Sequence, residues 1–139
     1  MPPNLAMRTL LIFMTSALGA CCALAQQADP GIDWSKVDVV TVVMMDYAFS
    51  PPRVTFRHGV PTRLHLINNG TEIHDFTARD FFKTVDLRDA KVIASSGIGV
   101  AVEPHQYKDV EFIARLPGHF VLTCADHDWA GMRGDIVVQ

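Results

Sequence analysis

The sequence predicts an all-β sandwich built from short strands. Three observations support this fold class: apolar and polar residues alternate with a period of two in several runs, β-branched residues gather in those runs, and turn-forming residues separate them. Short strands spaced by turns in this way are typical of two packed sheets. The chain has 139 residues, so we expect one domain, and it contains no internal repeat or low-complexity tract.

The expected strands follow one another from residue 37. Val37–Met45 is rich in β-branched side chains and fits a buried strand. Tyr47–Ser50 predicts a second strand, which the turn Pro51-Pro52 ends. The later predicted strands alternate or are rich in apolar residues: Val54–Arg57, Arg63–Ile67, Val110–Ala114, Phe120–Cys124 and Ile136–Val138.

The stretch from Thr77 to Gln106 shows no single pattern. Within it, Phe81–Val85 is compatible with a strand or with a short helical turn, and Ala94–Gly99 has the composition of a loop. The sequence therefore leaves the packing of this stretch open.

The first 25 residues have the pattern of a secretory signal peptide. Arg8 is followed by the apolar run Thr9–Leu18 and by Ala23-Leu24-Ala25, which is an Ala-x-Ala cleavage site. A membrane anchor is the alternative, but a span needs about 20 apolar residues and this run is shorter. We expect residues 1–25 to be removed on export to the periplasm and residues 26–139 to form the mature domain.

Cleavage after Ala25 would leave Cys124 as the only cysteine, because Cys21 and Cys22 leave with the leader. Leu18-Gly19-Ala20-Cys21 also resembles a lipoprotein box, so lipidation of Cys21 and anchoring to a membrane stay an alternative. An unpaired cysteine in an exported protein indicates intermolecular pairing, a reactive thiol, or protection by a metal.

The charge of the mature chain excludes one class of partner. Removing residues 1–25 takes one of the 12 basic residues and none of the 15 acidic ones, which leaves a net charge of −4 with neutral histidines. Nucleic-acid binding requires a basic surface, so it is not expected. The sequence shows no paired carboxylates and no nucleophile–base arrangement, so we expect neither catalytic residues nor an enzyme.

Three soft-metal ligands lie within nine residues near the end of the chain. They are Cys124, His127 and Met132. The period of two places Cys124 on the face of Phe120 and Leu122, pointing into the sandwich. Two histidines and a cysteine in a plane, with a weak axial methionine, are the ligands of blue copper. One further histidine is then needed from elsewhere.

His74 is the best candidate for that second histidine. It follows the turn Asn68-Asn69-Gly70 and has the apolar flanks Ile73 and Phe76. The remaining histidines have the surroundings of solvated residues: His58, His65, His105 and His119. Zinc has little use for a thioether, and haem attachment through Cys-x-x-Cys-His is absent. We therefore predict one copper ion held by His74, Cys124, His127 and Met132.

The spacing Cys-x2-His-x4-Met, after an upstream histidine beside an Asn-rich turn, resembles the cupredoxins, the plastocyanin- and azurin-like type 1 blue copper proteins. Exported bacterial plastocyanin-like copper-binding proteins resemble it most, over residues 37–138. The resemblance implies a Greek-key β-sandwich of about eight strands with one type 1 copper at one end. It also implies a monomer that carries single electrons between redox partner proteins such as cytochromes, oxidases or dehydrogenases.

Two other functions remain open at this stage. One is periplasmic copper binding for copper tolerance or delivery, and the other is a metal-free structural module of the same fold. Proteins of copper tolerance often add Met-rich or His-rich tracts, which this chain lacks. Its one methionine pair, Met44-Met45, lies in a predicted strand and is expected in the core, so electron transfer is favoured.

The resemblance also implies roles for residues beside the ligands. Asp75 stands where many cupredoxins have asparagine; its N–H is expected to point at the Cys124 sulfur, its side chain to join the two ligand segments, and its charge to favour Cu(II). His127 is expected to present its ring edge to solvent beside Trp129. Asp126 and Asp128 would flank that edge and attract a positively charged partner.

Overall fold

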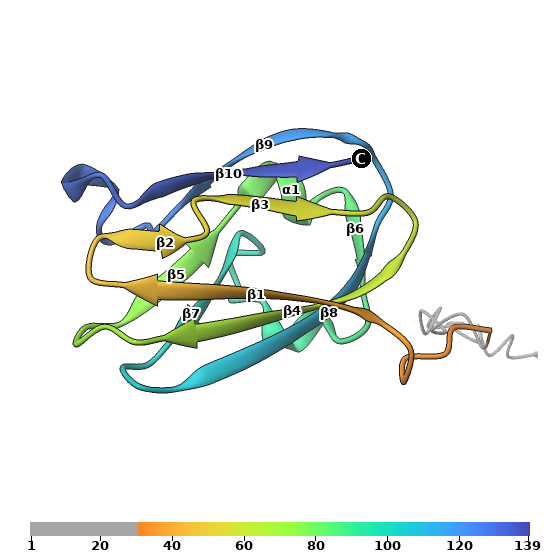
Figure 1. Cartoon of the computed structure of the whole chain (residues 1–139), viewed down its shortest axis with the longest axis horizontal. Coiled ribbons are helices and arrows are strands. Elements are labelled where there is room, and N and C mark those ends of the chain that lie inside the picture. The colour runs from red at the N-terminus through yellow and green to blue at the C-terminus, as the bar shows by residue number, and fades with distance from the viewer. Residues whose placement is uncertain (1–30) are drawn as a thin grey trace, which may run out of the picture.

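The fold is a sandwich of two five-stranded sheets, seen in a computed structural model that describes residues 31–139 (Figure 1). The predicted signal peptide and Cys21 lie outside the described residues. The first sheet has the order β2-β1-β4-β8-β6, with β1 (Asp38–Met45), β2 (Ala48–Ser50), β4 (Pro61–Asn68), β6 (Val85–Leu87) and β8 (Tyr107–Ala114). The second has the order β3-β10-β9-β5-β7, with β3 (Arg53–Phe56), β5 (His74–Thr77), β7 (Gly99–Val102), β9 (Gly118–Thr123) and β10 (Arg133–Val138).

Strands distant in the sequence pair within each sheet. β1 runs parallel to β4, and β3 runs parallel to β10, while β9 and β10 form an antiparallel pair. The chain reaches these pairings by crossing between the sheets, as after β2 and again after β3. The Greek-key β-sandwich expected from the sequence is confirmed.

Aromatic side chains fill the core between the sheets. The Phe56 ring stacks on Phe81 at 5.3 Å and meets Phe112 edge-on at 5.1 Å, measured between ring centroids. All three rings are fully buried, and burial of a side chain of this size contributes roughly 1.5–3 kcal/mol. Phe81 belongs to the four-residue helix α1 (Arg79–Phe82), which brings aromatic residues into the core from outside the sheets.

Of the ten strands in the described residues, β6 and β7 lie in the stretch that the sequence left open, and β5 ends at its first residue. β5, β6 and β7 were not predicted, and the ambiguous run Phe81–Val85 divides between α1 and β6. These strands have three or four residues each, which is too short to show a clear period. β5 and β7 pair with each other next to β9, so tertiary pairing defines them.

The expectation that Met44 and Met45 both lie in the core was wrong for Met45. Met45 is 42 % exposed whereas Met44 is fully buried, because neighbouring residues of a strand face opposite sides of the sheet. Ile73, the residue before His74, is 44 % exposed. Among the described residues, no helix is long and apolar enough to cross a membrane.

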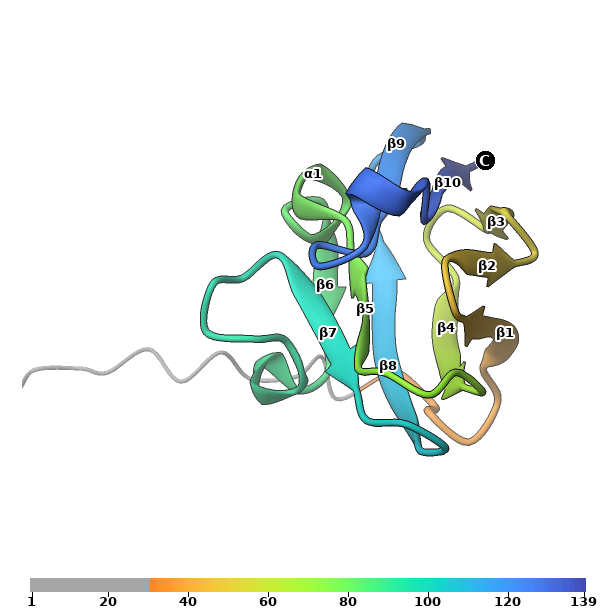
Figure 2. The same cartoon turned by 90° about the vertical axis from the view of Figure 1, so that its left-hand side faces the viewer.

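The loops of one end of the sandwich lie close together. They are the β1–β2 turn, the β4–β5 connection and the β9–β10 connection, at the left of Figure 1. Figure 2 shows this end facing the viewer, with the short 3-10 turn Asp128–Ala130 of the β9–β10 loop lying in front of the strands. The predicted ligands belong to these loops and to the strands they join.

Candidate metal centre

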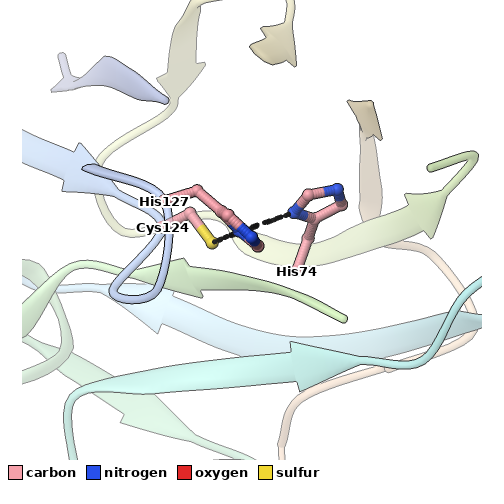
Figure 3. Close-up of side chains that lie close together, drawn as sticks. All are labelled: His74, Cys124 and His127. Carbon is pink, nitrogen blue, oxygen red and sulfur yellow. Dashed lines mark hydrogen bonds between the residues drawn. The ribbon is translucent and has the colours of Figure 1, made fainter. Parts of the chain in front are cut away.

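Three of the four predicted ligands converge at this end of the sandwich. His74 is the first residue of β5, Cys124 follows the last residue of β9, and His127 lies in the loop after it. β5 and β9 are neighbours in one sheet, with Thr77 opposite Thr123. Figure 3 shows the sulfur and the two rings pointing toward one another from these two segments.

The three donor atoms form a compact triangle. The Nδ1 atoms of His74 and His127 are 3.2 Å apart, and the Cys124 Sγ lies 3.9 Å from the first and 3.4 Å from the second. A point equidistant from these three atoms lies about 2 Å from each, which is the length of a metal–imidazole bond. The triangle therefore has the size of a trigonal metal site, and all three residues are buried.

The outer nitrogen of each ring is held by a carboxylate. His74 Nε2 lies 3.1 Å from Asp46 Oδ1, and His127 Nε2 lies 2.7 Å from Glu72 Oε2. A carboxylate accepts a hydrogen bond, so we assign the proton of each neutral ring to Nε2. Each Nδ1 then directs its lone pair at the centre of the triangle. Two nitrogen lone pairs directed at one point provide donors for a cation, so the geometry fits a bound metal ion.

Cys124 is a thiol when no metal is bound. Burial raises the pKa of Cys124 to about 11; the Asp75 N–H opposes this rise, and the Asp75 carboxylate adds to it. The thiol donates a hydrogen bond to Asp75 Oδ2 at 3.3 Å. A metal ligand must be deprotonated, so metal binding would replace this proton.

Asp75 joins the two ligand segments, as the sequence predicted. Its backbone N–H donates to the Cys124 Sγ at 3.4 Å. Its carboxylate accepts from the Ala125 N–H at 2.9 and 3.0 Å to the two oxygens, and from the Thr77 hydroxyl at 2.5 Å. Both roles expected of this position are therefore confirmed, with aspartate in place of asparagine.

Met132 is fully buried, and its backbone closes the ligand loop. The Cys124 N–H donates to the Met132 carbonyl at 3.1 Å, and the Met132 N–H donates to the His127 carbonyl at 3.2 Å. Gly131 precedes it with φ of +88°, a left-handed conformation that favours glycine. Met132 thus lies beside the donor triangle, and axial ligation by its sulfur stays a prediction.

The surroundings of His127 differ from the prediction. Its ring edge is covered, since the residue is only 8 % exposed and Glu72 occupies Nε2. Tyr47 packs edge-on against the ring at 5.5 Å between centroids, and Tyr47 also contacts Trp129, which is 77 % exposed as expected of this patch. Asp128, expected to flank the exposed ring edge, forms an ion pair with Arg133, with 3.6 Å between its Oδ2 and the Arg133 Nη2.

Sequence reasoning missed Asp46, Glu72 and Gly70. No motif marks Asp46, 28 residues before His74, as the partner of that histidine. Glu72 is close to His74 in the sequence, but it contacts His127, which is 55 residues away. At Gly70, a Cβ would lie 2.6 Å from His74 Nε2 and 2.4 Å from Asp46 Oδ1, so glycine leaves the space in which these two meet. The four histidines predicted to be solvated lie outside the cluster and are exposed or half-buried: His58, His65, His105 and His119.

Comparison with known proteins agrees with this fold. The family model of the cupredoxin-like domain matches residues 11–138. Among curated proteins there is no match. Among solved structures, dithionite-reduced auracyanin from Roseiflexus castenholzii has a TM-score of 0.55 at 16 % identity, over 73 % of this chain and 96 % of that chain.

Two other auracyanins give similar values. Auracyanin B has a TM-score of 0.56 at 17 % identity, over 73 % of this chain and 88 % of its own. Auracyanin A of Chloroflexus aurantiacus, described as a "blue" copper protein, has a TM-score of 0.51 at 15 % identity, over 73 % of this chain and 99 % of its own. At such low identities, these TM-scores show a shared fold alone. From the family match and this geometry, the chain belongs to the cupredoxin-like family, and its His74, Cys124 and His127 match a type 1 copper site.

Proposed function

We propose that this protein is a type 1 copper protein that carries single electrons between redox partner proteins in the periplasm. His74, Cys124 and His127 would hold one copper ion, with Met132 as the axial ligand. The observation that carries the proposal is the buried triangle of two imidazole nitrogens and one sulfur, whose size suits a trigonal metal. Copper bound by such ligands supplies one-electron redox chemistry.

The chain holds the donors in place independently of the metal. Cys124 and Met132 are joined through their backbones, and Asp75 ties β5 to the residue after Cys124. A site that needs little rearrangement between two oxidation states favours rapid electron transfer. The role of these residues is therefore to orient the ligands and to exclude water from them, and we assign no catalytic residue and no enzymatic reaction.

The surface next to the site suits a protein partner. Exposed aromatic and apolar side chains lie beside His127, including Trp129 and Tyr47, and Tyr47 contacts both the ligand ring and Trp129. Aromatic residues are enriched in the cores of protein interfaces. The carboxylates of Glu72 and Asp46 lie at the same end, so a partner with a positively charged surface is favoured. Suitable partners would be cytochromes, oxidases or dehydrogenases.

Loading the protein with Cu(II) tests the proposal. An intense visible band from sulfur-to-copper charge transfer is expected, and Cys124→Ser should abolish it while the circular dichroism of the fold persists. An intense band in the variant would exclude Cys124 as a ligand.

Reduction of the loaded protein separates electron transfer from copper delivery. An electron carrier should be reduced and reoxidised repeatedly with its copper retained during dialysis. Loss of the ion to a chelator or an acceptor protein on reduction would instead favour copper tolerance or delivery.

A further inference from the structure

Each of the three donor residues contacts a carboxylate of its own. Asp46 lies on His74, Glu72 lies on His127, and Asp75 lies on Cys124. The three acids come from different parts of the chain: the β1–β2 turn, the β4–β5 connection and β5 itself. Each donor residue is therefore in contact with one carboxylate, at the outer nitrogen of the two rings and at the sulfur of Cys124.

The contact between Asp46 and His74 is held from several sides. The Thr71 N–H and hydroxyl donate to the two oxygens of Asp46 at 3.0 and 3.1 Å, and the His74 hydrogen bond keeps the pKa of Asp46 below its usual range. Gly70 leaves the space for this contact, as its missing Cβ shows. The carboxylate is thus an oriented acceptor for the Nε2–H of a ring that is itself fully buried.

The contact between Glu72 and His127 is the shorter of the two carboxylate–histidine contacts: Glu72 Oε2 lies 2.7 Å from His127 Nε2. A carboxylate that accepts from Nε2–H pushes electron density onto the ring and makes its Nδ1 a stronger donor. The ring is covered on another side by Tyr47. The ring is nearly buried, so water has little access to the Nε2–H donor, while the Glu72 carboxylate is itself 56 % exposed.

The contact between Asp75 and Cys124 brings a negative charge to the sulfur. The Asp75 carboxylate lies 3.3 Å from Sγ and is fixed by the Ala125 N–H and the Thr77 hydroxyl. These two donors hold the carboxylate in place after the thiol proton has left. A thiolate and a carboxylate side by side then repel each other, and a higher positive charge on the metal relieves this repulsion most.

We infer that Asp46, Glu72 and Asp75 act together as positioning residues that lower the reduction potential of the site and make this protein an electron donor to partners of higher potential. The inference rests on the proposed function and deepens it. All three contacts favour the metal ion with the higher charge. At the two rings the carboxylates make Nδ1 a stronger donor, and at Cys124 the higher metal charge relieves the repulsion between thiolate and carboxylate.

The test replaces one carboxylate at a time by its amide, in the mature copper-loaded protein. Asp46→Asn, Glu72→Gln and Asp75→Asn keep an oxygen acceptor of the same shape and remove the charge. Midpoint potentials are measured by spectroelectrochemistry at low and at high ionic strength. At a fixed ambient potential each variant should raise the ratio of Cu(I) to Cu(II) about tenfold, which is about 59 mV for one electron.

Matched controls remove charges that do not touch a donor. Asp135→Asn removes an exposed carboxylate paired with Arg53, and Asp86→Asn removes an exposed carboxylate on β6 paired with Arg115. Both should leave the midpoint potential unchanged at high salt, because distant exposed charges are screened. Proton NMR of the diamagnetic Cu(I) protein gives a second readout: the Nε2–H of His127 should exchange slowly in the wild type and in Glu72→Gln, and rapidly in Glu72→Ala.

The outcomes separate the inference from the proposed function. A wild-type protein with no reversible copper couple would overturn both. A reversible couple whose potential moves no more in the three contact variants than in the two controls would overturn the inference alone. Circular dichroism identifies any variant that fails to fold, and the remaining contact variants then decide the result.

Discussion

Replacing Gly70 with alanine should distort the ligand His74 without touching the metal. The added Cβ would stand 2.6 Å from His74 Nε2, 2.9 Å from His74 Cδ2 and 2.4 Å from Asp46 Oδ1. Ordinary van der Waals contact begins near 3.4 Å, so the neighbouring atoms must move by about 1 Å. His74 is fully buried and begins β5, so its ring has little room to move.

Two effects follow from this displacement. Overpacking of a buried site costs about 1–3 kcal/mol, and the metal-free variant should lose that much unfolding free energy. Loss of the outer contact that orients a ligating histidine costs about 10–100-fold in metal affinity. Urea unfolding of the metal-free protein measures the first effect, and competition with a Cu(I) chelator measures the second.

A second substitution shows whether the clash is the cause. Asp46→Ala removes one of the atoms that the new Cβ would meet, so Gly70→Ala should cost less stability in that background than in the wild type, as a double-mutant cycle reports. Asn69→Ala, at the exposed neighbouring position, serves as the control for the turn. Wild-type stability and copper affinity in Gly70→Ala would refute the reasoning about this contact.

Three further predictions concern the axial ligand Met132, the two aspartates beside His127, and a glutamate of β8 that pairs with two arginines. Met132→Gln should keep copper bound, lower the midpoint potential and alter the visible spectrum; an unchanged potential would place Met132 outside the coordination sphere. Asp126→Asn with Asp128→Asn should slow electron transfer to a cationic cytochrome, and the difference should shrink as salt rises; identical stopped-flow curves would leave these aspartates no role in recognition. Glu111 is mostly buried, which raises its pKa, but hydrogen bonds from two arginines outweigh this and lower it overall. Its stabilisation is therefore present above the unfolded-state carboxyl pKa and lost as the pH falls through the lower folded value, so Glu111→Gln should destabilise at pH 7 and lose that effect in acid; an equal urea midpoint shift at both pH values would contradict this.

The ligand loop could be predicted from sequence because it is local. Cys124, His127 and Met132 are close in the chain, and their side-chain chemistry already restricts the metal. The period of two also placed Cys124 on the inner face, where it is fully buried. His74 was chosen among the other histidines by its turn and its neighbours, and it lies at the donor triangle as predicted.

The strands that the sequence missed are the ones whose definition depends on partners. β6 and β7 have three and four residues, and their side chains carry too few positions for an alternating pattern. β7 forms a strand because β5 lies beside it, and β6 because β8 does. Such pairing arises only when the chain has folded, so the sequence of each short segment carries little sign of it.

The sequence by itself determined which atoms could bind a metal and that two sheets would hold them. Only the tertiary structure decided what touches those atoms from outside. Asp46 is 28 residues from His74 and Glu72 is 55 residues from His127, and the chain brings each pair together through loops of different strands. The same folding covers the edge of His127, which the sequence had placed at the surface. A donor's identity is a local chemical property, whereas its charge environment depends on how distant strands pair.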